Sequence, residues 1–528
     1  MSSKIFKLSS ITLAVAASFS FGAHAAIYNV YDYQPVVNGN AKTYGVAIEP
    51  GSTDCWGNAC TQTTSQIAYE EKLYYEGFNY RDEAPFRYEF GYDLLEEGYD
   101  GFTSYCGSYL GYNSTLCDDW ATDQYTNGYA RESSTVNNSM AYIESGSSQV
   151  QSAENNVIVN SFASGTGDAI GTYYGGSLKN RTVAYSDTSL DSTGYDQSKV
   201  WAKSGSLYVG SVSKQSTNNT NDYYSYGAVW NGSTLKRINW VSDVGEDGRS
   251  MPQGSARDLA DVSGTTYAVG YNSDSDEKPV AAVFNLTDLD SISTSFVSRF
   301  QNESNYLNSI LTSINTNGIA IGEVKYATPL NGAYANSLFY ITDPANPNSS
   351  YSEFSGSIFF SGANGKAGAI NNNDEAVGAI DNQTHQESGG GKPRSQRAFI
   401  APLSSNAKAP LNNRAWYLDD LTNDGISSST NNQFRIIDAT DINDSGVISG
   451  TALYCSGGYE TTAIDSKCNG GIDGSEKIVA VKLVPINGAT ASDIQARPVT
   501  QEDKVDRQGG SLGFLALTLL GFLGFRRK

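Results

Sequence analysis

The sequence predicts an all-β protein, and more specifically a β-propeller of about six or seven blades. Two observations lead to this class. The 528-residue chain contains 53 Gly and 35 Tyr but only 3 Met and 17% charged residues, a composition that favours strands and tight turns over helices with charged faces. A short segment also recurs through the middle of the chain, which is typical of repeat architectures.

Residues 1–25 have the pattern of a secretory signal peptide. Two lysines precede an apolar run, and small residues stand at Ala23 and Ala25. We expect cleavage between Ala25 and Ala26. An uncleaved membrane anchor is the alternative.

Residues 26–155 are predicted to hold a strand that closes the ring and a large insertion. The closing strand is expected at Thr43–Ile48, pairing with Lys477–Val484. Between Gly51 and Ala130 the chain is acidic, rich in tyrosine and carries four cysteines. Tyrosine combines rigid contact area with a polar tip, so the insertion is a recognition surface or a subdomain that caps one face of the propeller. We favour the cap.

The six cysteines form three pairs of near neighbours. This spacing suits disulfides that close small loops in an oxidising compartment, although spacing alone does not fix the connectivity. Zinc is the competing interpretation, but no pair has C-x-x-C spacing. The predicted disulfides are Cys55 with Cys60, Cys106 with Cys117, and Cys455 with Cys468.

Residues 156–490 carry the repeat, whose clearest form is I-N-x-x-G-x-x-x-G. Copies such as SINTNGIAIG and DINDSGVISG end at Gly171, Gly210, Gly270, Gly322, Gly378 and Gly450. Asn and Gly suit a turn after a strand, and a second apolar stretch follows each copy and pairs back on it. Each unit is then a small sheet that buries its faces only against its neighbours, as a propeller blade does. A β-solenoid is the structural alternative.

This repeat resembles the HAF family of extracellular bacterial repeats, in which I-N-x-x-G-x-x-x-G precedes a His-Ala-Phe strand. The matching residues are Ile314, Asn315, Gly318 and Gly322, and Ile442, Asn443, Gly446 and Gly450. The family's histidine does not occur here, since Arg397 precedes Ala398 and Phe399. The chain looks like an uncharacterised family of secreted Gram-negative proteins with such repeats. The resemblance implies a fold and an extracellular location, and it implies no reaction.

Residues 509–528, after a polar linker at 491–508, resemble the GlyGly C-terminal sorting signal of Gram-negative bacteria. Gly509 and Gly510 precede an apolar run and three cations. The run is shorter than the ~20 residues that a spanning helix needs. The resemblance implies a transient membrane stop, cleavage by a rhomboid-type protease, and delivery through the periplasm to the cell surface or the medium. A permanent short anchor is the alternative.

The charge of the chain excludes two classes of partner. The formal net charge is −21, and removal of both ends would take away cations only. Nucleic acid and anionic lipid require clustered Lys and Arg, so we expect no nucleic acid and only transient membrane contact through the C-terminal tail. Signal peptidase and the rhomboid-type protease are the expected processing partners. An extracellular protein or glycan is the expected ligand.

No catalytic residue is predicted. After processing, His385 is the only histidine and lies in a glycine-rich loop, where nothing indicates a neighbour that would hold a base in place. Arg249 and Arg257 lie in a long polar stretch that reads as a loop between blades, where ligands often bind. An ion pair with Asp247 or Asp258 is the simpler account of these arginines.

No cofactor is predicted, and besides zinc the one ion considered is calcium. In DINDSG, Asp441, Asn443, Ser445 and Gly446 occupy positions 1, 3, 5 and 6 of an EF-hand-like loop. Position 12 is Ala452, where a bidentate Glu is needed. We therefore interpret the segment as a plain turn.

These observations favour an exported, non-enzymatic propeller that binds a protein or a glycan. The alternative is a secreted hydrolase that acts on glycosides through paired carboxylates. A deep funnel lined by carboxylates would favour hydrolysis, and a shallow face rich in tyrosine would favour binding.

Overall fold

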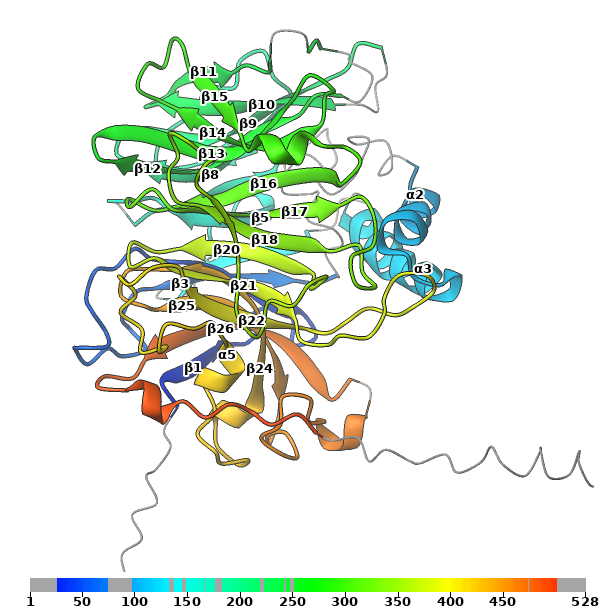
Figure 1. Ribbon diagram of the computed structural model, residues 1–528, viewed down its shortest axis with the longest axis vertical. Coiled ribbons are helices and arrows are strands. Elements are labelled where there is room, and N and C mark those ends of the chain that lie inside the picture. Colours follow the sequence, from blue (N-terminus) through cyan, green and yellow to red (C-terminus); the bar gives the residue numbers. More distant parts are fainter. Residues whose placement is uncertain are drawn as a thin grey trace, which may run out of the picture.

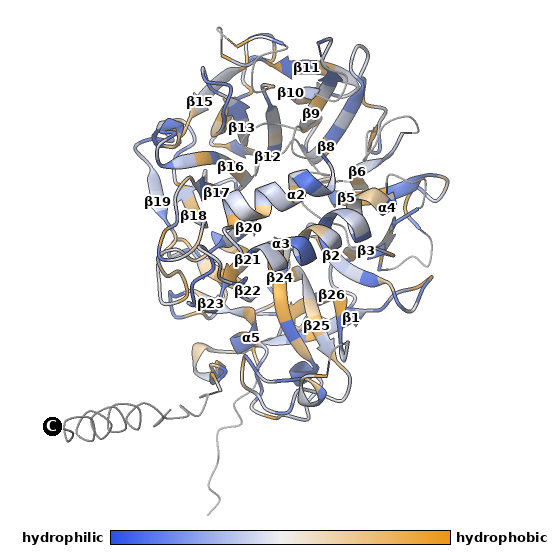
Figure 2. Ribbon diagram, turned by 90° about the vertical axis from the view of Figure 1, so that its right-hand side faces the viewer, coloured by the Kyte–Doolittle hydropathy of each residue, from blue (hydrophilic) through white to orange (hydrophobic). Residues whose placement is uncertain are grey.

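A computed structural model describes residues 26–500, apart from 75–96, 133–136, 145–148, 166, 176–182, 219–222, 242–243, 247–250 and 473. The described strands form seven sheets of three or four strands each, and Figure 1 shows these sheets stacked one after another. Figure 2, turned to look onto one face, shows them around a common centre. The architecture is a seven-bladed β-propeller, which confirms the predicted fold class.

Six blades follow one another in chain order. Their first strands contact each other around the centre of the ring, and the later strands of each blade lie progressively outward. The strands are β2 (Lys42–Ile48), β3 (Ile67–Lys72) and β4 (Ser139–Ile143); β5 (Asn155–Phe162), β6 (Ala169–Tyr174) and β7 (Val183–Tyr185); β8 (Gln197–Ser204), β9 (Leu207–Gln215), β10 (Tyr223–Asn231) and β11 (Thr234–Ile238); β12 (Gly254–Val262), β13 (Thr265–Ser273), β14 (Pro279–Asn285) and β15 (Ser293–Phe296); β16 (Tyr306–Ile314), β17 (Ala320–Tyr326), β18 (Asn336–Ile341) and β19 (Tyr351–Glu353); and β20 (Gly365–Ile370), β21 (Glu375–Asp381), β22 (Gln396–Pro402) and β23 (Trp416–Tyr417).

The seventh blade joins the two ends of the described chain. Its strands, from the centre outward, are β24 (Phe434–Ile442), β25 (Ile448–Cys455), β26 (Glu476–Pro485) and β1 (Tyr28–Tyr33). The predicted partner segment 477–484 is confirmed, because it lies in β26 and pairs with the N-terminal strand. The predicted closing strand 43–48 is wrong, because it forms β2 of the first blade. Both segments alternate in burial, so the pattern alone does not distinguish them.

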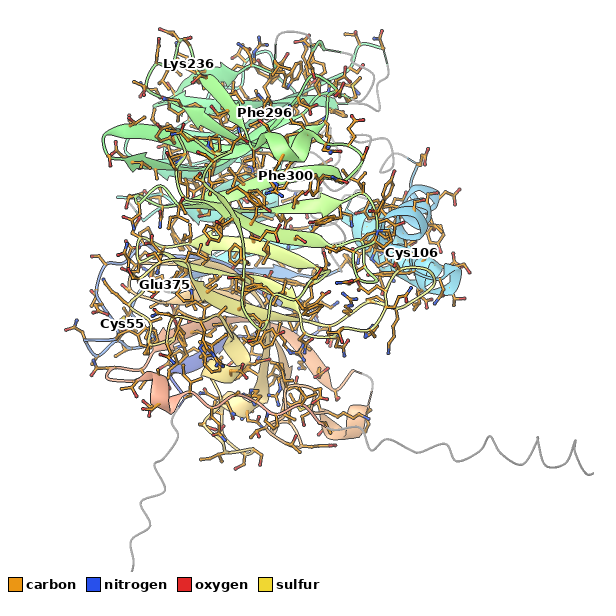
Figure 3. All side chains as sticks on the ribbon, viewed as in Figure 1. Cys55, Cys106, Lys236, Phe296, Phe300 and Glu375 are labelled. Atoms are coloured by element: carbon orange, nitrogen blue, oxygen red, sulfur yellow. A yellow bond between two sulfur atoms is a disulfide. The ribbon has the colours of Figure 1, made fainter. Side chains whose placement is uncertain are left out.

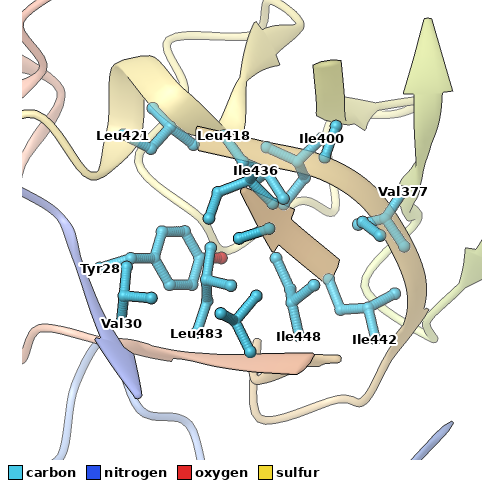
Figure 4. Packing of buried hydrophobic residues seen from close by; sticks show 14 of the residues in the cluster. Tyr28, Val30, Val377, Ile400, Leu418, Leu421, Ile436, Ile442, Ile448 and Leu483 are labelled. Atoms are coloured by element: carbon cyan, nitrogen blue, oxygen red, sulfur yellow. The ribbon is translucent and has the colours of Figure 1, made fainter. Parts of the chain in front are cut away.

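Apolar side chains between neighbouring sheets hold the blades together. Figure 4 shows the cluster between the sixth and seventh blades, where Val377 lies beside Ile442, and Tyr28 of the closing strand packs beside Leu483. Burial of each such side chain stabilises the fold by about 1.5–3 kcal/mol. The closing strand is therefore part of the core.

The insertion is helical and interrupts the first blade between β3 and β4. Its described elements are α2 (Tyr99–Tyr105), η2 (Cys106–Leu110), α3 (Ser114–Ala121), η3 (Thr122–Tyr129) and α4 (Ala130–Glu132). Phe102 and Tyr105 share a buried cluster with Tyr271 and Ile310 of the ring, and Figure 2 shows α2 and α3 over the centre of the ring. The insertion thus caps one face, as favoured above, but the sequence did not predict its helices.

All six cysteines lie in the described ranges and form the three predicted disulfides. The bonds join Cys55 to Cys60, Cys106 to Cys117, and Cys455 to Cys468. Only the second bond lies in the helical insertion, and Figure 3 places Cys55 and Cys106 on opposite faces. The predicted processing residues Ala25, Gly509 and Gly510 lie outside the described residues.

Candidate functional site

Each innermost strand is irregular along its length. The register of all seven described innermost strands shifts relative to the second strand, as between Ala256 and Asp258 of β12. Such a β-bulge disrupts the ladder, and in six blades a glycine stands beside it on the second strand. A Cβ atom at Gly270 would lie 1.9 Å from the carbonyl oxygen of Ser255. The close approach of this carbonyl explains the glycine that ends each repeat.

The asparagine of the I-N motif joins neighbouring blades. Its amide oxygen accepts main-chain N–H groups of its own turn; for Asn371 the donors are Asn373 and Glu375. Its amide nitrogen donates to the corresponding carbonyl of the next blade, from Asn315 to Asn371 (2.9 Å), from Asn371 to Asn443 (3.0 Å) and from Asn443 to Glu49 (2.9 Å). The motif therefore closes a turn and links blades in succession.

We expect Asn371→Ala to lower the free energy of unfolding by about 3 kcal/mol, because it leaves the N–H groups of Asn373 and Glu375 without their acceptor. Urea denaturation of the purified protein would measure the loss. The exposed Asn40 provides a control, since Asn40→Ala should change stability by less than about 0.5 kcal/mol. A loss as small as that of the control would contradict the linking role.

The ends of the innermost strands and the turns after them surround a cavity of about 690 Å³. Every blade contributes to its wall. Glu375 follows one of the lining turns, and Figure 3 shows it on the face opposite Cys106 of the helical cap. The cavity therefore opens at the end of the central channel that the cap leaves uncovered.

Two half-buried carboxylates, those of Asp258 and Asp441, line this cavity beside the bulges of the fourth and seventh blades. Asp258 Oδ2 accepts hydrogen bonds from the Ile314 main-chain nitrogen (2.9 Å) and from Ser313 Oγ (2.8 Å). Asp441 Oδ2 accepts one from the Ile48 main-chain nitrogen (2.9 Å). The other oxygen of each carboxylate accepts the N–H of the following residue. Each carboxylate thus ties its blade to the next.

Burial makes both carboxylates weaker acids than usual. It raises the pKa of Asp258 to about 6, although the hydrogen bonds that its carboxylate accepts oppose the shift. Burial likewise raises the pKa of Asp441 to about 7, and the negative charge of Asp258 contributes to this shift. Two carboxylates with raised pKa values in one cavity mark it as a candidate site.

We expect the protein to become more stable as the pH falls from about 8 to about 5. Burial raises the pKa of Asp381 and Asp420, elsewhere in the fold, to about 7 as well. An acid whose pKa is raised by folding holds more protons in the folded state, so stability falls as the pH rises from its unfolded pKa through its folded pKa. Melting temperatures across this range would test the sign, and Asp441→Asn should weaken the dependence. A melting temperature that rises with pH would contradict it.

Neither Arg257 nor His385 lines the cavity. Arg257 lies on β12 at its bulge and not in a loop, and its guanidinium carbon lies 3.6 Å from the ring centroid of Trp201. Arg249 lies outside the described residues. His385 Nε2 lies 3.1 Å from the carbonyl oxygen of Lys392 in the loop between β21 and β22. A bulged strand in a polar stretch resembles a loop, which accounts for the error at Arg257.

Sequence reasoning did not identify Asp258 and Asp441 as cavity residues. Asp258 entered only as an ion-pair partner and Asp441 only as a position in a calcium-type loop. In the DINDSG segment, Asn443 instead binds main-chain groups of its own turn, including the Val447 N–H. The sequence does contain a signal for both residues. Each Asp stands directly before an apolar residue at a strand bulge, Asp258 in the segment RDL and Asp441 in the segment TDI.

The family described as "Protein of unknown function (DUF3466)" matches residues 256–528. No curated protein matches the chain. Among the described helices, none has the length and hydrophobicity required to cross a membrane.

Three solved structures illustrate the likeness to known proteins. The α-L-arabinofuranosidase PaAbf62A of Podospora anserina is 10% identical, with 53% of this chain and 87% of that chain covered and a TM-score of 0.20. Fructan 1-exohydrolase IIa of Cichorium intybus is 10% identical, with 56% of each chain covered and a TM-score of 0.22. The NanB sialidase of Streptococcus pneumoniae is 8% identical, with 88% and 59% covered and a TM-score of 0.26. At these values the likeness says nothing about what this chain does.

Proposed function

This chain belongs to the DUF3466 family of proteins of unknown function, and we propose that it is an exported propeller that binds a segment of another protein in its central cavity without catalysing a reaction. The observation that carries the proposal is the cavity of about 690 Å³ at the uncapped end of the central channel. Cavities of about 300–1,000 Å³ are the usual size of ligand sites.

The lining of the cavity favours a polypeptide over a glycan. Phe162 is the only aromatic residue in the described lining, and its side chain is buried, being 6% exposed. A sugar ring therefore finds no open aromatic face to pack on. The rest of the wall combines polar and charged side chains, such as those of Asn315 and Glu49, with aliphatic ones, such as that of Ile314. This mixture suits an extended segment that carries hydrogen-bonding groups.

Selection from a peptide display library on the full protein would test this function. Selected peptides should lose at least about tenfold in affinity with Ser164→Trp, which places a large ring at an exposed lining residue. The control is Ser291→Trp, an exposed position in the loop between β14 and β15. Equal binding to both variants would overturn the proposal, and enrichment on a glycan array with the same sensitivity to Ser164→Trp would replace it with a glycan-binding function.

Glycoside hydrolysis is the second candidate, favoured by the two carboxylates that face one cavity with raised pKa values. Against it, both oxygens of each carboxylate already accept hydrogen bonds from the protein. Nitrophenyl glycosides would separate the candidates. Turnover that falls at least about a thousandfold in Asp258→Asn or Asp441→Asn would establish hydrolysis, whereas equal background rates in all proteins fit binding alone.

We also propose export and processing at both ends, which would leave membrane contact transient. The three disulfides support an oxidising compartment. The intact mass of protein from the medium of the native host should correspond to a chain from Ala26 to about Gly510, lacking one pair of hydrogens per disulfide. A mass that retains Leu512–Lys528 would overturn removal of the tail.

A further inference from the structure

We infer that the central cavity takes a protonated amine, such as the side chain of a lysine in the bound segment. The inference rests on the binding function proposed above and names the chemistry that the segment must present. Three features of the wall carry it: its charge, its hydrogen-bonding groups, and the way its carboxylates are already held.

The wall carries an excess of negative charge. Five carboxylates lie among the described lining residues, and they come from the first, fourth and seventh blades. They belong to Glu49, Asp258, Asp261, Asp441 and Asp444. Their donors are uncharged: beyond those of Asp258 and Asp441 given above, these are the main-chain nitrogens of Gln66, Gly264 and Asn372 and the amide of Asn372. Among the described residues, none of the hydrogen bonds to these five carboxylates comes from a cationic side chain, although Lys482, which pairs with Glu144, also interacts electrostatically with Glu49.

The one cation in the described lining is already paired. Lys203 Nζ lies 2.6 Å from Asp187 Oδ2, and Asp187 is not a lining residue. The pair contributes no net charge to the wall. The five carboxylates therefore set the potential of the cavity, and a low-dielectric wall concentrates that potential.

The hydrogen-bonding groups of the wall point to the same ligand. The amide nitrogens of Asn315, Asn371 and Asn443 are used in the links between blades, and that of Asn372 is used on Asp444. A carboxylate accepts about four hydrogen bonds in total, and among the described residues the Gln66 main-chain N–H donates to Glu49 Oε2. The wall thus offers carboxylate acceptors, whereas its asparagine amide donors are already used, so a ligand rich in donors suits it.

An ammonium fits this wall better than a guanidinium or a metal ion. A guanidinium prefers both oxygens of one carboxylate in a planar fork, but both oxygens of Asp441 already hold main-chain N–H groups. Among the residues that the structure describes, no three His, Cys, Asp or Glu side chains converge as a metal site requires. An ammonium donates single hydrogen bonds to several carboxylates, because its three N–H donors rotate freely.

Calorimetric titration with tri-lysine peptide, acetylated and amidated at its ends, tests the inference on the full protein at low salt. The matched probe is the same peptide with its side chains acetylated, which keeps the length and removes the charge. We expect the charged peptide to bind at least about tenfold more tightly than the acetylated peptide. Tri-arginine and calcium chloride serve as further probes, and tighter binding of either would overturn the choice of an amine.

Two pairs of substitutions locate the site. Glu49→Gln with Asp261→Asn removes two wall charges and keeps an oxygen acceptor for each main-chain donor. We expect about a tenfold loss of tri-lysine affinity from this pair. Asp288→Asn with Asp290→Asn removes two exposed charges outside the cavity and should leave the affinity unchanged. Equal losses from both pairs would show only attraction to an acidic protein and would overturn the inference.

The pH dependence of binding gives an independent readout. Besides Asp258 and Asp441, the titratable groups that face the cavity are Glu49, Asp261, Asp444 and the paired Lys203. A bound cation favours the ionised forms of Asp258 and Asp441, whose pKa values burial raises to about 6 and about 7. The affinity should therefore rise by about tenfold between pH 5.5 and pH 8. Peptides that bind through Ser164-sensitive contacts but show no preference for lysine would leave the binding function intact and overturn the amine alone.

Discussion

Replacement of Gly270 by alanine should lower the free energy of unfolding by about 3 kcal/mol or more. The added Cβ would lie 1.9 Å from the carbonyl oxygen of Ser255 and 2.9 Å from its carbonyl carbon. Neither atom belongs to a flexible side chain, so relief requires the bulge of β12 to move. Because that bulge also places Asp258, the same substitution should weaken binding at the cavity.

Urea denaturation of Gly270→Ala and Gly322→Ala would measure the effect in two blades, since a Cβ at Gly322 would meet the Ile310 carbonyl oxygen at 2.0 Å. Gly39 is the matched control. It has no atom within 4 Å of its added Cβ, so Gly39→Ala should leave stability within about 0.5 kcal/mol of the wild type. Similar stabilities for all three variants would show that the glycines are not needed for the bulge.

The repeat made the fold predictable, because each copy carries the strand, turn and glycine of one blade. The sequence did not reveal why the glycine is needed, since the clash at Gly270 is with the carbonyl of Ser255, fifteen residues earlier in the chain. The role of Asn371 was likewise only half predicted. The turn that Asn371 closes is local and can be predicted from the sequence. Its hydrogen bond to the Asn443 carbonyl cannot, because it joins residues that lie 72 positions apart in the chain.

The helical cap and the cavity were harder to predict for physical reasons. The cap helices bury Phe102 and Tyr105 against the ring, so tertiary contacts override a tyrosine-rich composition that reads as strand. Asp258 and Asp441 come from the fourth and seventh blades and line one cavity only when the ring closes. The pattern of a single sequence does not show which residues of distant blades line the same cavity. The acid before an apolar residue at the bulge of both strands is nevertheless a signal that these two residues have equivalent positions.

Deletion of residues 26–33 should prevent the ring from folding, so that the truncated chain shows no cooperative unfolding transition. This is a larger effect than that of any single substitution considered above. The deletion removes the buried side chains of Ile27, Tyr28 and Val30 from the core between the last two blades. Loss of each costs about 2–5 kcal/mol, and the sum reaches the 5–15 kcal/mol that typically stabilises a domain.

The deletion also exposes the edge of β26. Tyr28–Tyr33 pairs along this strand, and an uncovered edge strand is prone to pair with other chains. Truncated protein should therefore aggregate, and a synthetic peptide of residues 26–33 should restore a cooperative melting transition by adding back the strand. A scrambled peptide is the control. A truncated chain that melts cooperatively at the wild-type temperature would show that the ring closes without β1, through contacts between β26 and β2 and between Lys482 and Glu144 alone.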